Sequence, residues 1–382
     1  MNSIVNGHIL TMDGEDFKDG FIIVENGKIM NIGDMKEYDY DVVNTIDVKG
    51  KYLLPGLVDC HTHLGMINDS ASKSNSDSNE ICGAIQPQLH VLDAINIFDR
   101  GFEDARSSGV TSVVVCPGSA NVIGGQCTAI KTSPGDCVDQ MIIKKTVAVK
   151  AALGENTKNM YRAKDKAPAT RMGIAALLRQ TLIETKIYKK KKEKDDTLYD
   201  FRLESLLSVM DKKLPLKIHA HRSDDICTAL RIAKEFNIAI SLEHCTEGLR
   251  VAQQLKDAEV PIVVGPLLIA RGKDELKNQS VFTPKAFYDA GLKFAIMSDH
   301  PCMPVNFLLL SAIVASRYGL PEKEALKAVT IYPAEIAGID HKVGSLSLGK
   351  DADILVFDGD PMDARSNVVS TFIDGKLVYS IR

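Results

Sequence analysis

From Gly56 onward, short apolar runs alternate with amphipathic helical stretches, and this alternation constrains the fold more than any other feature of the sequence. Buried parallel strands are continuously apolar, whereas surface helices repeat apolar residues every three or four positions. Their alternation is typical of βα units repeated around a parallel sheet. The runs that we expect to be strands are 57–59, 111–115, 146–149, 216–219, 238–242, 261–264 and 293–297, with helices such as 226–236 and 249–258 between them.

Both ends of the chain instead show strand and turn patterns. Near the N-terminus, the apolar run 21–24 leads through Asn26-Gly27, a hairpin signal, into the run 29–32. Near the C-terminus, the runs 354–357, 368–373 and 377–380 are separated by turn residues. We therefore predict an α/β protein with a (β/α)8 TIM-like barrel over residues 56–344 and a small β-sandwich domain built from residues 1–55 and 345–382 together.

A strongly polar stretch interrupts the barrel pattern near residues 160–200, and Lys189–Lys192 lie within it. The plain interpretation is the solvated end of a surface helix. The alternative is a lid inserted over the site, because long βα loops often carry functional segments.

The composition excludes several classes of partner. The 46 basic and 50 acidic residues give a net charge of -4, which argues against nucleic acid or an anionic membrane as the main partner. We expect neither a signal peptide nor a membrane span, because the first residues lack a basic leader and no run of about 18 apolar residues occurs. The eight cysteines form no CxxC pair, which is typical of reduced thiols, so we expect a cytoplasmic protein.

Two histidines follow the first expected barrel strand. His61 and His63 stand two residues apart, and such residues on a strand point to the same side. Neutral imidazole is a common ligand of zinc and related divalent ions. The carboxyl ends of the strands form the active-site face of a barrel, so we expect a metal site there.

Further candidate ligands stand at other strand ends. His219 and His244 end two successive expected strands, and Asp299 follows the strand that ends at Met297. Each residue alone is compatible with an ordinary polar loop position. Because a closed barrel gathers its strand ends into one ring, we expect these side chains to converge with those of His61 and His63.

The segment 55–63, Pro-Gly-Leu-Val-Asp-Cys-His-Thr-His, resembles the barrel entry of the amidohydrolase superfamily, and the segment 344–356 resembles the return to its small β domain. The likeness is closest to the imidazolonepropionase-related and prolidase-like branch and covers nearly the whole chain apart from 160–200. It implies that His61 and His63 bind a buried metal ion and that His219 and His244 bind a more exposed one. It implies that Asp299 contacts the buried ion and acts as general base, and that the protein forms homo-oligomers.

The same resemblance suggests a ligand that bridges two metal ions. Lys150 stands where this branch often carries a carboxylated lysine, whereas some relatives use a glutamate, for which Glu155 is the candidate. The cofactor we expect is one or two zinc ions per chain, although the same ligands would accept manganese, iron, cobalt or nickel.

The substrate contacts are less evident in the sequence. His221 points to the same side of its strand as His219, so it is a candidate for substrate binding or for an exchange of roles. Arg222 could anchor a carboxylate, and so could Arg171 and Tyr161. Gln126 ends the glycine-rich segment 118–126, which is either a plain loop or a ligand-binding loop.

The expected reaction is hydrolysis of an amide or cyclic amide C–N bond of a small molecule. A divalent metal makes hydroxide available at neutral pH and polarises the carbonyl, and Asp299 moves the proton. One alternative is a deaminase of the same superfamily. The other is a non-catalytic binding relative, but the chain retains every candidate ligand and Asp299, which argues against this second alternative.

Overall fold

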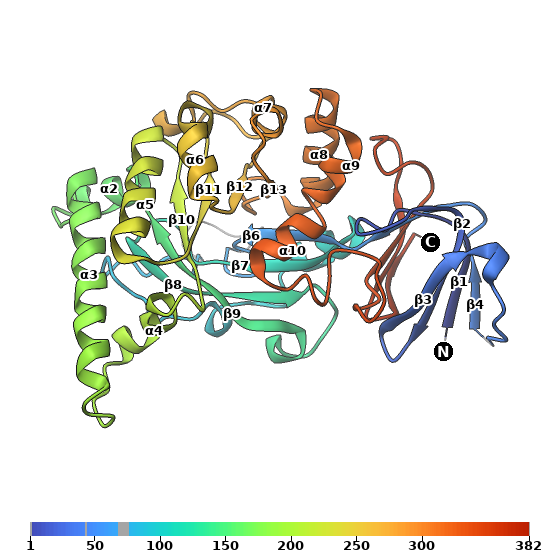
Figure 1. The fold of residues 1–382 in the computed structure, drawn as a ribbon, viewed down its shortest axis with the longest axis horizontal. Helices are drawn as coiled ribbons and strands as arrows, with labels where there is room; N and C mark the ends of the chain where they lie inside the picture. Colours follow the sequence, from blue (N-terminus) through green and yellow to red (C-terminus); the bar gives the residue numbers. More distant parts are fainter. Residues whose placement is uncertain (1, 43, 68–75, 382) are drawn as a thin grey trace.

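Two sheets organise the molecule, whose computed structural model describes residues 2–42, 44–67 and 76–381. The central sheet and its helices form the larger part, and the second sheet stands at one end of the molecule (Figure 1). The fold class expected from the sequence, a barrel of the TIM type with a small β domain made from both ends of the chain, is confirmed.

The central sheet contains eight strands within the described residues, and they follow one another in chain order. All of its neighbouring pairs are parallel except those of β8, which is antiparallel to both β7 and β9. Backbone hydrogen bonds from His63 N to His300 O (2.9 Å) and from Asp299 N to His61 O (3.2 Å) connect the first strand to the residues after the last one. The strands are β6 (Leu57–Thr62), β7 (Val110–Val115), β8 (Ile123–Lys131), β9 (Ile142–Ala152), β10 (Leu216–Ala220), β11 (Ile240–His244), β12 (Ile262–Val264) and β13 (Phe294–Ile296).

The strand β8 was not expected from the sequence. Its first residues, Ile123–Gln126, belong to the segment that we interpreted as a glycine-rich loop. The pair Gly124-Gly125 is more typical of a loop than of the start of a strand. Gly125 has a φ of 131°, which residues with a side chain rarely adopt. The strand continues through the buried residues 127–130, and only a short 3-10 helix, Val138–Met141, separates it from β9.

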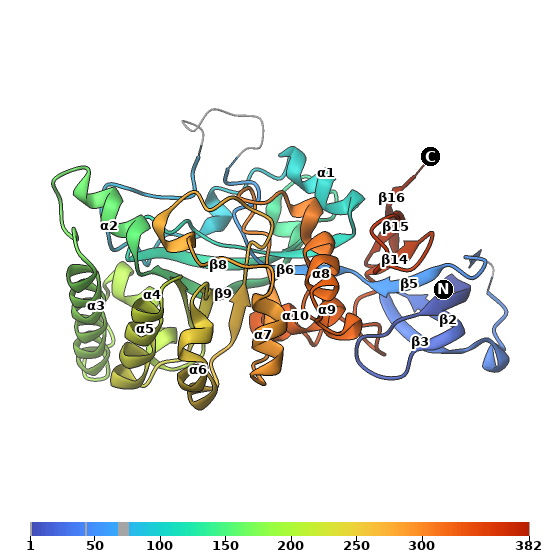
Figure 2. The same ribbon diagram turned by 90° about the horizontal axis from the view of Figure 1, so that it is seen from above.

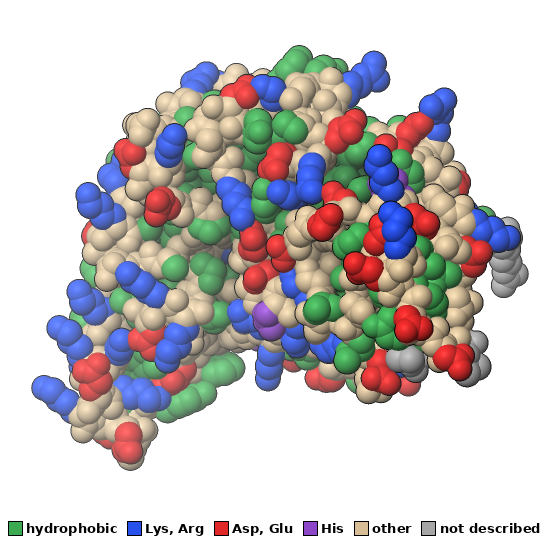
Figure 3. Space-filling model, turned by 45° about the vertical axis from the view of Figure 1, so that its right-hand side comes forward, with side chains coloured by type: hydrophobic (Ala, Val, Ile, Leu, Met, Phe, Trp, Pro, Cys, Tyr) green, Lys and Arg blue, Asp and Glu red, His purple; other side chains and the backbone are tan. Residues whose placement is uncertain are grey.

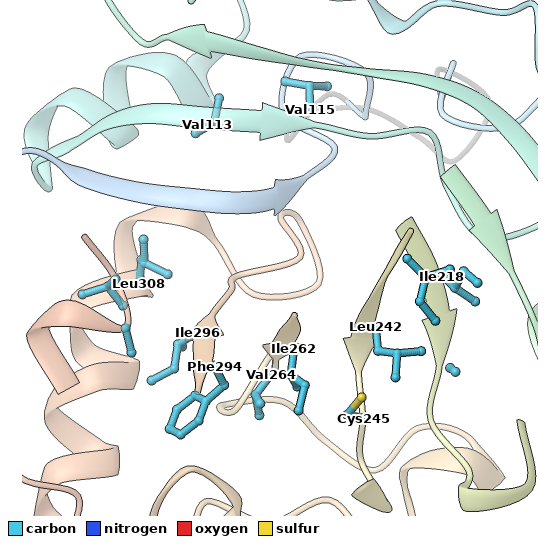
Figure 4. Packing of buried hydrophobic residues seen from close by; sticks show 14 of the residues in the cluster. Val113, Val115, Ile218, Leu242, Cys245, Ile262, Val264, Phe294, Ile296 and Leu308 are labelled. Atoms are coloured by element: carbon cyan, nitrogen blue, oxygen red, sulfur yellow. The ribbon is translucent and has the colours of Figure 1, made fainter. Parts of the chain in front are cut away.

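Alternate residues of the barrel strands face opposite sides, which produces two apolar layers. Val113 and Val115 belong to the outer layer between strands and helices, whereas Val114 belongs to the layer inside the barrel. Part of the outer layer is drawn in Figure 4, where Ile296 of β13 and Leu308 of α8 lie at the same interface. The inward positions near the carboxyl ends of the strands are therefore free for polar side chains.

Helices cover the outer side of the barrel, and Figure 2 shows several of them in a row beside the strands. They are α1 (Arg100–Ser107), α2 (Glu155–Arg162), α3 (Arg171–Lys192), α4 (Phe201–Met210), α5 (Ser223–Phe236), α6 (Ala252–Ala258), α7 (Thr283–Asp289), α8 (Leu308–Arg317), α9 (Glu322–Lys327) and α10 (Ile331–Ala337). Among the described residues, no helix is both long and apolar enough to cross a membrane.

The polar stretch near 160–200 contains the helix α3 and leads into α4. Ile174, Leu178 and Leu182 bury one side of α3 in the outer core. At its C-terminal end, Lys189 pairs with Asp211, and Lys192 pairs with Glu204 on α4. These two lysines thus bind the neighbouring helix, whereas Lys190 and Lys191 are exposed.

Both ends of the chain contribute strands to the small domain. Its sheet follows the order β16-β15-β14-β5-β1-β2-β3, with β4 paired to β1, and the antiparallel pair of β5 and β14 joins the two ends. The N-terminal strands in blue and the C-terminal strands in red therefore lie together in Figures 1 and 2. The strands are β1 (Asn2–Ile9), β2 (Phe17–Glu25), β3 (Lys28–Asp34), β4 (Asn44–Asp47), β5 (Tyr52–Pro55), β14 (Ile354–Phe357), β15 (Val368–Ile373) and β16 (Lys376–Ser380).

The surface carries charges of both signs. On the face shown in Figure 3, Lys and Arg side chains are interspersed with Asp and Glu side chains. This distribution agrees with the small net charge of -4.

Candidate metal centre

The five candidate histidines and Asp299 lie at the carboxyl ends of four barrel strands, and Asp299 follows β13. His61 and His63 come from the end of β6, His219 and His221 from β10, and His244 ends β11. His244 and Asp299 have positive φ values of 73° and 53°, which non-glycine residues rarely adopt. Such backbone conformations concentrate at functional sites, where the surrounding structure holds them.

Two groups of possible metal ligands share one histidine. The ligand atoms of His61, His244 and Asp299 all lie within 4.8 Å of one another, and so do those of His219, His221 and His244. In addition, Asp299 Oδ1 lies 3.4 Å from His61 Nε2 and 3.3 Å from His63 Nε2. The side chains that the sequence predicts to converge are therefore brought together around His244.

Hydrogen bonds from the far ring nitrogens fix the orientation of these imidazoles. His63 Nδ1 donates to Cys116 O (2.7 Å), His244 Nδ1 donates to Gly265 O (2.8 Å), and His61 Nδ1 donates to Glu243 Oε2 (2.8 Å). Carbonyl and carboxylate oxygens only accept, so the proton is on Nδ1 and the Nε2 lone pair faces the centre. Partners of this kind typically orient metal-binding histidines.

The donor set fits a divalent metal ion. The Nε2 atoms of His61, His219 and His221 are buried and have no hydrogen-bond partner among the described residues. Buried polar atoms are usually paired, so this cluster of free lone pairs suits an ion. Burial lowers the pKa of His61 to about 4 and that of His244 to about 3, and it also lowers the pKa of His219 and His221. These imidazoles are therefore neutral at pH 7, which is the form that binds metal.

Asp299 is a carboxylate in this environment. Burial alone would raise its pKa, but the hydrogen bond with His63 and the adjacent His244 and His61 hold the pKa well below its usual range. A charged oxygen thus stands beside the open Nε2 atoms of the histidines.

The two candidates for a bridging ligand occupy different places. Lys150 on β9 is only 1% exposed, and its Nζ makes no hydrogen bond with the described residues. Burial lowers the pKa of the Lys150 amine, and its charge acts on His61, His219 and His221. Glu155 begins α2, and its backbone N donates to Glu275 Oε1 (2.7 Å). Glu155 belongs to neither group of ligand atoms.

The candidate substrate-binding residues do not lie together in one place. His221 lies within the cluster, and its Nδ1 is 2.8 Å from Thr246 Oγ1. Arg222 is half-exposed and held by Asp224 through contacts of 2.9 and 2.8 Å. Gln126 donates to Pro87 O (3.4 Å), and its side-chain oxygen accepts from Thr146 Oγ1 (3.5 Å). The earlier candidates Arg171 and Tyr161 bind Asp225, Glu275 and Asn121.

Two charged residues inside the barrel were missed in the sequence. Glu243 accepts from Lys217 Nζ (2.9 Å) and Ser241 Oγ (2.7 Å) with the carboxylate that also binds His61. Only Lys217 carried a signal in its spacing, because it stands two residues before His219. Glu243 directly precedes His244, so strict alternation along the strand would place it on the opposite side. A third residue, Asp59, accepts from the backbone N of His61 (3.1 Å) and of Ser298 (3.0 Å) and thus connects β6 to the Asp299 segment.

A roomy groove lies elsewhere on the molecule. A groove of about 810 Å³ runs between α5 and α6 and is lined by residues such as Leu230, Lys234, Gln254 and Val260. None of the possible metal ligands lines it. The candidate metal centre is therefore identified by its ligand atoms and not by the volume of a cavity.

Comparisons with known proteins agree with this geometry. A profile of the amidohydrolase family matches residues 52–378. The crystal structure of an amidohydrolase from Thermotoga maritima MSB8 has 37% identity and a TM-score of 0.96, and the match covers 100% of both chains. An imidazolonepropionase of Fusobacterium nucleatum is 22% identical over 94% of this chain and 91% of its own length. The amidohydrolase tasK of Hapsidospora irregularis is 27% identical over 93% of this chain, which spans 39% of the length of tasK.

Proposed function

Because the chain belongs to the amidohydrolase family and is thus a hydrolase of carbon–nitrogen bonds, we propose that it uses one or two divalent ions, with zinc as the first candidate, to hydrolyse an amide or cyclic amide of a small molecule. The observation that carries this proposal is the convergence of neutral, buried imidazoles on the Asp299 carboxylate, with three Nε2 atoms that make no hydrogen bond with the described residues.

The ligand atoms divide into two positions. We assign His61, His63 and Asp299 to one ion, and His219 and His244 to a second ion, with His221 close enough to contribute to the second position. Lys150 is our candidate for the residue between them. Its buried amine has a lowered pKa, which favours the neutral form, and only a neutral amine adds to carbon dioxide to give a carbamate.

Metal activation, proton transfer and orientation of the ligands would fall to different groups of this centre. A divalent ion at this centre would lower the pKa of water and polarise the scissile carbonyl. Asp299 accepts the proton of the attacking water and returns it to the leaving nitrogen. Glu243 and the carbonyls of Cys116 and Gly265 hold the imidazoles in one orientation. His221 faces the same space and is placed to contact the substrate where it does not bind the ion.

We place the enzyme in the cytoplasm, an assignment supported by its eight free cysteines, because cysteines remain reduced there. The expectation of a homo-oligomer is retained from the likeness to the family.

The test combines metal content with turnover. Protein purified without chelator should carry one or two divalent ions per chain by plasma mass spectrometry and should hydrolyse members of a panel of cyclic amides and acylated amino acids. The variant Asp299→Asn should retain bound metal at the His219–His244 position while turnover falls by about 10²- to 10⁴-fold, the usual contribution of a general base.

Three results would contradict the proposal. An absence of bound metal, even after incubation with zinc or manganese, would remove the mechanism. Ammonia release from aminated heterocycles without amide hydrolysis would favour the deaminase. Ligand binding that does not change in Asp299→Asn, without turnover in either protein, would favour a binding protein.

A further inference from the structure

A buried ion pair lies inside the barrel beside the candidate metal centre. Lys217 Nζ of β10 donates to Glu243 Oε1 of β11 (2.9 Å), and the two side chains are only 4% and 0% exposed. Their neighbours Ile218 and Leu242 belong to the outer core (Figure 4), so alternation along the strands directs Lys217 and Glu243 inward. The removal of two charges from water costs about as much free energy as their attraction returns. The pair therefore needs a reason other than the stability of the fold.

Glu243 connects this pair to a proposed metal ligand. Its second carboxylate oxygen, Oε2, accepts from His61 Nδ1 (2.8 Å), and Ser241 Oγ donates to the Oε1 atom that binds Lys217 (2.7 Å). Hydrogen bonds thus run from β10 through β11 to β6. The φ of 73° at His244 departs from the extended backbone, so His244 and its neighbour Glu243 both face the inside of the barrel.

These hydrogen bonds reach one of the two proposed ion positions. The first ion position is the one assigned to His61, His63 and Asp299, and the second is the one assigned to His219 and His244. The Nδ1 atom of His61 has a charged acceptor, whereas those of His63 and His244 donate to backbone carbonyls. A charged acceptor binds more strongly than a neutral one, so the first ion position receives the stronger support.

The ion pair also distinguishes two buried lysines that stand side by side. Lys217 of β10 is the register partner of Lys150 on β9, and the two residues are 3% and 1% exposed. Glu243 binds Lys217, whereas Lys150 Nζ makes no hydrogen bond with the described residues. Because Lys217 is engaged by Glu243, Lys150 is the one of these two lysines whose amine is open to bridge the ions.

We propose that Lys217 is a positioning residue, which acts through Glu243 to hold His61 in the orientation that binds the ion of the first position. The ammonium fixes one oxygen of the Glu243 carboxylate, and the other oxygen accepts the Nδ1 proton of His61, so the Nε2 lone pair is directed at the ion. This inference rests on the proposed function, because it names the ion position that the pair supports.

Zinc affinity tests the proposal without turnover, because it is measured on the metal-free protein by competition with a coloured chelator. In Lys217→Met, zinc should bind to the first ion position roughly 10- to 100-fold more weakly, the usual effect of losing a partner behind a ligand. Lys217→Arg should restore part of this affinity, since a guanidinium also pairs with a carboxylate. The effect of Lys217→Met should persist in a His219→Ala background, which lacks a ligand of the second position, and should disappear in a His61→Ala background.

Two controls separate positioning from a general loss of stability. Lys131→Met removes another buried lysine, whose side chain is 7% exposed and whose ion pairs join the barrel to the small domain, and this variant should bind zinc as the wild type does. The double variant Lys217→Met/Glu243→Gln leaves no unpaired buried charge and keeps an acceptor for His61. It replaces Lys217→Met if that variant does not fold, and the same loss of zinc affinity is expected.

Three results would overturn the inference. They are an unchanged zinc affinity in a folded variant without Lys217, an equal loss of affinity in Lys131→Met, and an undiminished effect of Lys217→Met in the His61→Ala background. A wild-type protein that binds no zinc would overturn the proposed function as well. The two failures are therefore distinguishable by the zinc affinity of the wild type.

Discussion

Glu243 shows how one residue can serve two layers of the barrel interior. One carboxylate oxygen orients His61, and the other binds Lys217 below it. Burial alone would raise the pKa of Glu243, but the charge of Lys217 and the hydrogen bond with His61 lower it to about 2. A carboxylate behind a histidine increases the basicity of the imidazole and fixes its tautomer. The buried ion pair therefore supports the metal centre more than it stabilises the fold.

The competition between Lys150 and Glu155 can be decided at single residues. Lys150→Ala removes a buried group that faces the ligands, so the metal content should fall from about two ions toward one or none. Glu155→Gln changes a side chain outside both ligand groups and should leave the metal content within error of the wild type. Plasma mass spectrometry on the two variants measures this difference. The reverse order would transfer the bridging role to Glu155.

The sequence predicts the individual ligands because each stands at a strand end with the correct periodicity. His61 and His63 share one side of β6, and the apolar runs before His219, His244 and Asp299 locate the other strand ends. Lys273 lies in an irregular segment and Asn156 at the start of α2, so no strand periodicity relates these two residues to their neighbours in space. Their hydrogen bonds to each other and to Ser119 become visible only when the segments after β7, β9 and β12 are seen together.

At the scale of elements, Lys131 joins the end of β8 to the small domain. Its Nζ contacts Asp353 (2.7 Å), Asp351 (2.9 Å) and Asp374 (3.2 Å), which belong to the segments around β14, β15 and β16. The apolar periodicity of the sequence did not predict β8. The glycines at its start are typical of a loop, and β8 runs antiparallel to both β7 and β9, whereas βα units would give parallel strands. The helices and parallel strands were easier to predict, since their apolar repeats are longer.

Lys131→Met should destabilise the protein by about 3–5 kcal/mol at pH 7, because three carboxylates would lose a buried partner. These carboxylates hold the pKa of Lys131 above its ordinary value of 10.5. The stabilisation is therefore complete below pH 10.5 and is lost as the pH rises through the folded-state pKa. Urea unfolding of both proteins between pH 7 and 11 should show a constant difference that narrows only at the alkaline end.

A matched variant tests whether burial is the reason. Lys28→Met removes a lysine that pairs with Asp351 while its own side chain is 43% exposed, so the cost should stay below about 1 kcal/mol. Equal losses of unfolding free energy in the two variants would show that the burial of Lys131 adds nothing to its ion pairs.

At the scale of the whole molecule, the small domain and the barrel share one hydrophobic core. Leu355 and Phe357 of β14 belong to the same buried cluster as the outer layer of the barrel. Leu355 packs so closely on Gly109 that a Cβ there would lie 2.7 Å from Leu355 Cδ1. β5 leads through Gly56 directly into β6, and Thr371 Oγ1 donates to Arg106 O (2.8 Å) at the end of α1. Separate unfolding of the small domain would expose these apolar surfaces.

We therefore expect the two parts to unfold together, although domains of larger proteins often unfold separately. Leu355→Ala should cost about 2–5 kcal/mol because Leu355 is fully buried at the joint. In differential scanning calorimetry, this variant should shift a single transition of the metal-free protein to lower temperature. Ile22→Ala, which opens a cavity in the separate core of the small domain, should lower that same transition. If either variant instead shows a separate transition of small enthalpy at lower temperature, the small domain unfolds independently. The contacts in the shared core would then not couple the unfolding of the two parts.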